Sequence, residues 1–148
     1  MEMDKTQARQ LAQTVAYGRI AIGITAMVAP SLPLRPWVGD LAGDRRGKLL
    51  ARSLGARDLA LGLGVILAMK HDAPVRGWVE GSGLADAGDV LSTVLAFGKL
   101  PKGGRWLVLL SAAGAAAIAR LASQYVDADD DTIDLAGASA SRSPAYPA

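Results

Sequence analysis

The chain has 148 residues and a formal net charge of +2, and 51% of the residues are hydrophobic but only 5% aromatic. It contains no cysteine, which excludes disulfides, thiolate metal sites and a thiol nucleophile. The near-neutral charge, with no basic run interleaved with aromatics, argues against nucleic-acid binding. A composition rich in Ala, Leu, Val and 17 glycines is typical of helices that approach one another closely in lipid.

Four apolar segments follow one another along the chain, after a polar lead-in at residues 1–10. They cover about 11–29, 48–69, 75–97 and 105–121. Each has ~17–23 residues, and a membrane span needs roughly 20. Prolines and glycines punctuate the connection at 30–47, which we expect to be a loop with Trp37 as an interfacial anchor. We expect the acidic and then Ala/Ser/Pro-rich residues 123–148 to form a disordered tail.

The first apolar segment has one feature of a signal peptide, because Lys5 and Arg9 precede it. However, Arg19 interrupts the apolar run, and no small-x-small cleavage site precedes Pro30. We therefore interpret it as an uncleaved first span.

Charges lie near the centres of the second and third segments, where lipid would make them costly. On an insertion scale, Asp86 and Asp89 cost about 2.5–3.5 kcal/mol each, whereas each apolar residue of that segment contributes about 0.3–0.6 kcal/mol. Arg57 and Asp58 leave the second segment marginal as well. Either these helices are soluble, or they insert together with their charges paired inside a bundle.

The angular positions of the charges favour the bundle. At about 100° per residue, Arg52, Arg57 and Asp58 spread around the second helix and cannot share one solvated stripe. This predicts a central helix. In the third helix, small and polar residues form one stripe, and the leucines lie opposite. The first helix has its own small-residue stripe, which consists of Ala12, Ala16, Arg19, Gly23 and Ala26. The residues that we expect at helix-packing contacts are Gly23, Gly55, Gly62, Gly64 and Ser82.

If the four segments alternate in direction, five charged residues fall within roughly 5 Å of one plane, at about 1.5 Å per residue. They are Arg19, Arg57, Asp58, Asp86 and Asp89. Arg52 lies about 9 Å from this plane, toward the first and third connections. We therefore predict a buried polar layer at mid-membrane depth, in which Arg57 pairs with Asp86 and Arg52 with Asp89.

Three interpretations of this layer stay open. It is a set of ion pairs that fixes helix register, a lined cavity for a small polar or amphipathic ligand or a proton path, or part of a soluble or peripheral bundle. The Asp86-x-x-Asp89 spacing is also that of a paired-carboxylate or metal site, but the neighbouring arginines favour structural pairs. Arg45-Arg46-Gly47-Lys48 is most simply a juxtamembrane anchor for anionic headgroups.

The motifs as a set resemble a known family. They are Gly18-Arg19 with Gly23 and Pro30, then Arg52-x-x-Gly55-Ala-Arg57-Asp58 with Leu61-Gly62, then Asp86-x-x-Asp89. This set resembles an uncharacterised family of small four-span bacterial membrane proteins, known only as a domain of unknown function and distantly similar in size to the DoxX-like proteins. The resemblance covers about residues 10–122. It implies four spans in a bacterial inner membrane and supplies no activity.

We therefore predict an all-α, antiparallel four-helix transmembrane bundle at residues 11–122. The first hypothesis is a structural, accessory or interaction protein, which predicts a dry layer with no cavity. The alternative is small-molecule binding or transport, which predicts a pocket that reaches the layer. An enzyme is disfavoured because no nucleophile–base pair or metal-ligand cluster is visible, and no cofactor or metal is expected. The expected partners are the lipid bilayer and a membrane protein or second copy of the chain. The basic residues divide almost evenly between the two sides, which leaves the orientation open.

Overall fold

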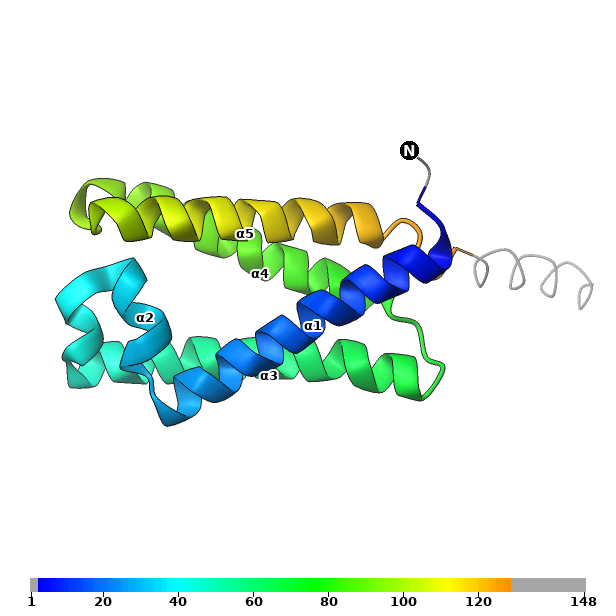
Figure 1. The fold of residues 1–148 in the computed structure, drawn as a ribbon, viewed down its shortest axis with the longest axis horizontal. Coiled ribbons are helices and arrows are strands. Elements are labelled where there is room, and N and C mark those ends of the chain that lie inside the picture. Colours follow the sequence, from blue (N-terminus) through cyan, green and yellow to red (C-terminus); the bar gives the residue numbers. More distant parts are fainter. Residues whose placement is uncertain (1–2, 129–148) are drawn as a thin grey trace, which may run out of the picture.

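The computed structural model describes residues 3–128, and every regular element in this part of the chain is a helix (Figure 1). The elements in order are α1 (Lys5–Val28), α2 (Ser31–Val38), the 3-10 turn η1 (Gly39–Gly43), α3 (Arg45–Lys70), α4 (Arg76–Leu95), the 3-10 turn η2 (Phe97–Lys99) and α5 (Lys102–Ala122). The predicted all-α class is confirmed for the described residues.

The four long helices run back and forth along one axis, so that each is antiparallel to the next long helix in the chain (Figure 1). α1 packs mainly against α3, and α4 packs mainly against α5. The short α2 contacts α3 and α5 at the end of the molecule where α1 ends. The molecule thus consists of two helix pairs with α2 between them at one end.

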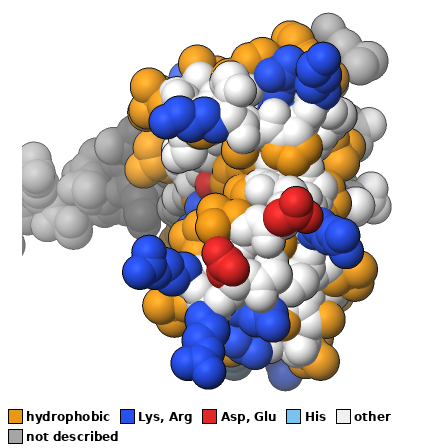
Figure 2. Space-filling view, turned by 90° about the vertical axis from the view of Figure 1, so that its left-hand side faces the viewer, with side chains coloured by type: hydrophobic (Ala, Val, Ile, Leu, Met, Phe, Trp, Pro, Cys, Tyr) orange, Lys and Arg blue, Asp and Glu red, His pale blue; other side chains and the backbone are white. Residues whose placement is uncertain are grey.

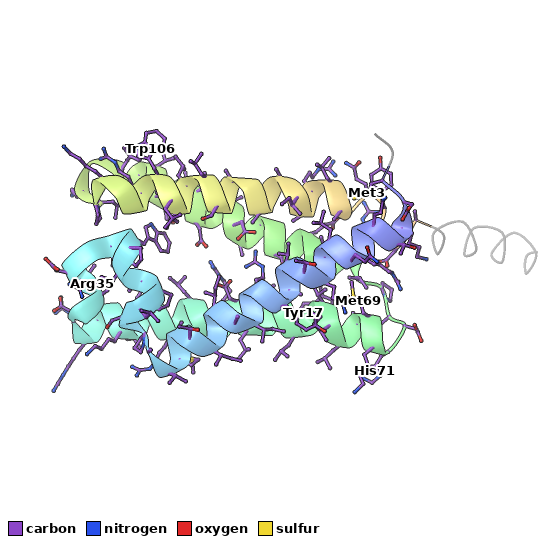
Figure 3. All side chains as sticks on the ribbon, in the orientation of Figure 1. Met3, Tyr17, Arg35, Met69, His71 and Trp106 are labelled. Carbon is purple, nitrogen blue, oxygen red and sulfur yellow. The ribbon has the colours of Figure 1, made fainter. Side chains whose placement is uncertain are left out.

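The packing places small residues inside and large apolar residues outside. The stripe of α1 predicted to face its neighbours is buried: Ala12, Ala16, Arg19, Gly23 and Ala26. In α4, Ser82, Asp86 and Thr93 are buried. On the opposite face of α4, Leu84 and Leu95 are 76% and 79% exposed. Figure 3 shows Tyr17 of α1 and Trp106 of α5 on outer faces in the same way. The predicted inward stripes are therefore confirmed.

Two of the described helices, α1 and α5, are long and apolar enough to cross a membrane, which is weak evidence for a membrane protein. Charged residues interrupt α3 and α4, and these two helices do not meet the same criterion. The structure therefore supports the predicted four-helix transmembrane bundle only in part.

The helix α1 begins earlier than the predicted residue 11. Asp4 caps it, because its side chain accepts a hydrogen bond from the backbone N–H of Gln7 at 2.7 Å. The Gln7 side chain accepts in return from the Asp4 N–H at 3.3 Å. This reciprocal capping box satisfies two amides that the first helical turn leaves open. Most of the predicted polar lead-in is consequently helical.

The connection at 30–47 is also helical, as α2 and η1, and not the expected loop. Pro33 lies in the first turn of α2, where its missing N–H would have no helical partner. Gly104 at the start of α5 lets the two helices meet, since a methyl group on it would overlap the carbonyl oxygen of Pro36. This segment is thus a short helix that packs against α5.

The chain stays packed beyond the predicted start of the tail at residue 123. Val126 and Asp127 are buried. The Asp127 carboxylate accepts hydrogen bonds from the backbone N–H groups of Val75 and Arg76, both at 2.8 Å. Asp127 also pairs with Arg9 at 3.3 Å. The last described turn therefore caps α4 and joins it to α1. The remainder of the predicted tail lies outside the described residues.

Candidate functional site

A buried layer of arginine and aspartate side chains crosses the middle of the molecule. Arg19 from α1 is its centre, with only 7% of its surface exposed. Its Nη1 donates to Asp58 Oδ1 on α3 at 2.8 Å, and its Nη2 donates to Asp86 Oδ2 on α4 at 2.5 Å. Nη2 also donates to the backbone oxygen of Ser82 at 3.1 Å. One guanidinium therefore joins three helices.

A second arginine extends the layer. Arg57 on α3 donates to both carboxylate oxygens of Asp89 on α4, at 2.9 and 2.8 Å. Its Nη2 lies 3.2 Å from Oδ1 of Asp58, so Asp58 accepts from both arginines. Paired, planar contacts of this kind are the strongest form of arginine–carboxylate interaction.

The five predicted layer residues thus come together from three helices, but their pairing differs from the prediction. Arg57 pairs with Asp89 and not with Asp86, which is bound by Arg19. Arg52 is not part of the layer, and its Nε donates to the backbone oxygen of Met27 at 3.4 Å. The prediction placed each residue by its height along its helix axis and left out how each helix is rotated about that axis. This rotation decides which aspartate an arginine faces.

The glycines predicted at packing contacts are all buried. A methyl group on Gly23 would lie 2.7 Å from the carbonyl oxygen of Gly55, and one on Gly62 would lie 2.7 Å from that of Ala16. Both contacts join α1 to α3 at backbone distance. Gly64 instead packs under the Trp78 ring of α4. The close approach of α1 to α3 lets the short Asp58 side chain reach Arg19.

The charges of the layer do not balance. With all five groups ionised, Arg19 and Arg57 supply two positive charges against the three negative charges of Asp58, Asp86 and Asp89. Within residues 3–128, no hydrogen-bond donor contacts Oδ2 of Asp58 or Oδ1 of Asp86. Each charge has a partner, but the layer as a whole has one negative charge in excess and open acceptor positions.

A cavity of about 300 Å³ lies against this layer. Its walls include Arg19, Asp58, Asp86, Asp89 and Trp37, and all five α-helices contribute to them. The walls also include Ile22 of α1 and Ser111 of α5, which are exposed, so the cavity opens to the outside between these helices. A volume of about 300–1,000 Å³ with a few convergent polar groups is typical of small-molecule sites.

Sequence reasoning missed the contribution of α2 to this site. Trp37 is half-buried and lines the cavity beside Asp58 and Asp89, and also a smaller cavity of about 90 Å³ next to it. It is not at the edge of the bundle as an interfacial anchor. The signal that could have revealed this was the apolar pattern of Leu34, Trp37 and Val38 at helical spacing, which the surrounding prolines obscured.

Among the described residues, no group of three His, Asp or Glu side chains could hold a metal ion. Comparisons with protein-family models, curated proteins and solved structures found no match to this chain. The resemblance to small four-span bacterial membrane proteins therefore stays a prediction. Any function assigned to this chain consequently rests on the geometry of the layer and its cavity.

Proposed function

We propose that this protein is a multi-pass membrane protein of the bacterial inner membrane, in which α1, α3, α4 and α5 cross the bilayer. We further propose that it binds or transports a small cationic molecule at its Arg/Asp layer. The cavity of about 300 Å³ against that layer carries the functional part of the proposal. A layer that only fixed helix register would have no need of it.

The distribution of apolar side chains supports insertion. Only 28% and 17% of the most apolar stretches of α1 and α5 are buried in the molecule, unlike the core helices of a soluble protein. Large side chains such as Val28, Leu84 and Leu95 are more than three-quarters exposed. In water these faces would cost free energy, whereas in lipid they are the favoured surface.

The central charges of α3 and α4 are compatible with insertion because they are paired. Arg57 and Asp58 of α3, and Asp86 and Asp89 of α4, all take part in the layer's ion pairs. Ionisable residues inside membrane proteins usually face the bundle interior, pair with one another and mark ligand or ion pathways. The four helices have 20 to 26 residues, which at about 1.5 Å per residue are long enough to span a hydrocarbon core of roughly 30 Å.

The charge of the layer favours a cation as ligand. The excess negative charge and the open carboxylate oxygens attract a positive group. Trp37 lines the cavity, and aromatic rings attract cations electrostatically. Most of the other wall residues, such as Val15 and Val108, are apolar or small, which suits an organic ammonium group better than a metal ion.

A structural or accessory role is the second candidate, because the Arg57–Asp89 pair directly joins the two halves of the bundle. In this role the layer would set helix register, and the outer faces would bind a membrane-protein partner or a second copy of the chain. The two candidates differ in one respect that can be measured. Only the first predicts that a cation stabilises the protein at the cavity.

Carbonate extraction of membranes tests insertion first, and recovery of the protein in the soluble fraction would refute the membrane proposal.

The cation site is tested by the thermal unfolding midpoint of the protein in lipid nanodiscs. The midpoint is measured at increasing concentrations of tetramethylammonium chloride, of sodium chloride at equal ionic strength, and of neutral tert-butanol. We expect a saturable increase with tetramethylammonium alone. Ala115→Leu fills the cavity without changing a charge and should abolish that increase. An equal response to all three solutes, or an unchanged response in Ala115→Leu, would favour the structural role.

A further inference from the structure

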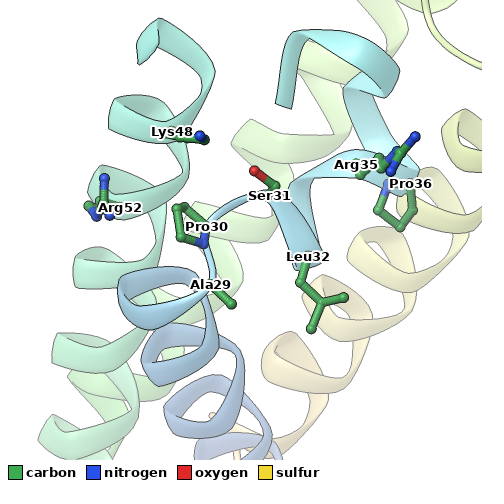
Figure 4. Close-up of a pocket in the computed structure, with 8 residues that line it drawn as sticks. All are labelled: Ala29, Pro30, Ser31, Leu32, Arg35, Pro36, Lys48 and Arg52. Carbon is green, nitrogen blue, oxygen red and sulfur yellow. The ribbon is translucent and has the colours of Figure 1, made fainter. Parts of the chain in front are cut away.

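A second cavity, separate from the Arg/Asp layer, lies at the end of the molecule where α1 passes into α2. It has a volume of about 790 Å³ and lies between α2 and the first turns of α3. Figure 4 shows Lys48 and Arg52 on the α3 side, Arg35 and Pro36 on the α2 side, and Pro30 between them. Four of its eight lining residues are apolar and four are polar or basic.

The cavity concentrates positive charge that the protein itself does not neutralise. Lys48 and Arg52 are one helical turn apart on α3, and Arg35 lines the same cavity from the α2 side (Figure 4). Among the described residues, none of the three forms an ion pair with a carboxylate, and the only hydrogen bond from any of them is the long one from Arg52 to the Met27 carbonyl oxygen. Three like charges at one cavity repel each other, so an anion bound there is favoured.

The surrounding side chains are apolar and continue onto the outer face of the bundle. Leu32 lines the cavity and is 67% exposed, and Val28, four residues earlier at the end of α1, is 79% exposed. Pro30 forms a buried apolar part of the wall. A free inorganic anion would gain nothing from these contacts. An amphiphile with an anionic head and a hydrocarbon chain would use both the charge and the apolar surface.

The depth of the cavity fits a phospholipid headgroup. Asp58 marks the layer at the middle of α3, and Lys48 lies ten residues nearer to the start of that helix. At about 1.5 Å per residue this places Lys48 about 15 Å from the layer, at the edge of a hydrocarbon core of roughly 30 Å. Figure 2 shows this end of the molecule with basic side chains around its rim and few acidic ones.

We propose that the cavity at Arg35, Lys48 and Arg52 binds the phosphate of an anionic phospholipid, with the lipid's first acyl carbons against Leu32 and Val28. This proposal rests on the proposed membrane insertion, but not on the cation site. It also differs from a diffuse basic anchor, since it assigns the preference for anionic lipid to three named side chains around one cavity.

The test compares binding of dioleoyl phosphatidylglycerol and dioleoyl phosphatidylcholine to the delipidated protein in detergent, by native mass spectrometry. The pocket variant is Lys48→Gln/Arg52→Gln. The matched control is Lys70→Gln/Arg120→Gln, which removes the same charge from exposed positions at the opposite end. Arg35→Gln alone serves as a second pocket variant if the double variant fails to fold.

A basic residue near an anionic headgroup contributes about fivefold in affinity. We therefore expect phosphatidylglycerol to be preferred by the unmodified protein and the control, and the preference to fall about twenty-five-fold in the double variant. It should fall about fivefold in Arg35→Gln. An unchanged preference in the pocket variants, or an equal loss in the control, would overturn the proposal. Displacement of phosphatidylglycerol by millimolar inorganic phosphate would identify a free anion site instead and also overturn it.

Carbonate extraction of membranes separates this outcome from failure of the proposed function. A protein released into the soluble fraction would refute membrane insertion itself. A membrane-integrated protein that shows no preference for phosphatidylglycerol would overturn only the lipid site.

Discussion

Arg57 and Asp89 form a two-point ion pair between α3 and α4, with Nη1–Oδ1 at 2.9 Å and Nη2–Oδ2 at 2.8 Å. α3 belongs to one helix pair and α4 to the other, and direct packing between these two helices is sparse in the described structure. The ion pair thus connects the two halves where the cavity separates them. Its position gives it both a structural role and a place on the wall of the candidate ligand site.

The first prediction is that Arg57 and Asp89 are strongly coupled in stability. Removing either partner leaves the other charge without its two-point contact in a poorly solvated layer. We expect Arg57→Ala to reduce the free energy of unfolding in detergent by about 2–4 kcal/mol, and the coupling energy with Asp89→Ala to be about 1–3 kcal/mol.

The Arg57→Ala/Asp86→Ala cycle is the matched control, because the ion pairs of the layer do not join these two side chains directly. Arg57→Lys keeps the charge but loses the planar two-point geometry, so it should have an intermediate stability. Coupling as large in the control cycle as in the Arg57/Asp89 cycle would contradict the observed pairing.

The layer could be predicted from sequence because helical periodicity and depth are local properties. Arg19 lies on the same helix face as the small residues of its helix, and so do Asp86 and Asp89. Each of these stripes can be found from the 3.6-residue period of an α-helix. Which arginine meets which aspartate depends on the rotation and order of packed helices, which no single segment encodes. The contact of Asp127 with Val75 spans 52 residues, so the tail carried no local signal of it. In α2, Pro33 occupies a first-turn position that a helix tolerates, whereas Pro36 lies inside the helix, so the prolines gave the signal of a loop.

The second prediction concerns Arg19, which joins α1, α3 and α4. Arg19→Ala removes the only described donor to the Asp86 carboxylate and one of the two to Asp58. Breaking a buried pair in this way costs about 3–5 kcal/mol, since an unpaired charge is left buried. We expect a severe loss of folded yield, measured by size-exclusion chromatography in detergent.

Asp86→Asn in the Arg19→Ala background should restore part of that yield, because it removes the unpaired charge. Asp4→Asn is a matched control, since Asp4 is exposed and distant from the layer. A rescue by Asp4→Asn equal to that by Asp86→Asn would show that the loss had another cause.

The third prediction tests the close contact between α3 and α4 at Gly64. A methyl group there would overlap three ring atoms of Trp78, so the ring would have to move. We expect Gly64→Ala to lower the free energy of unfolding by about 1–3 kcal/mol. Gly114→Ala on α5 is the control, because no atom lies within 4 Å of its added methyl group. That control should be neutral or more stable by up to about 1 kcal/mol, through the better helix propensity of alanine. Thermal melting of both variants measures the difference, and equal effects would contradict the packing.

The fourth prediction concerns Asp127, which binds the start of α4 from the far end of the described chain. Its carboxylate satisfies two backbone N–H groups of the first turn and stabilises the positive end of the helix dipole. We expect Asp127→Ala to lower the free energy of unfolding by about 2 kcal/mol. Both backbone N–H groups donate to the same carboxylate oxygen, so Asp127→Asn keeps their acceptor but loses the negative charge, and it should lose about half as much.

Hydrogen exchange locates the effect, because amides at the start of α4 should lose protection in Asp127→Ala before those of α5. Glu80→Gln is the control. It weakens the exposed pair with Arg76 at 2.8 Å on the same helix, and such surface pairs contribute about 0.5 kcal/mol or less. If Asp127→Ala and Glu80→Gln had equal effects on stability and exchange, the carboxylate would not act as the cap of α4.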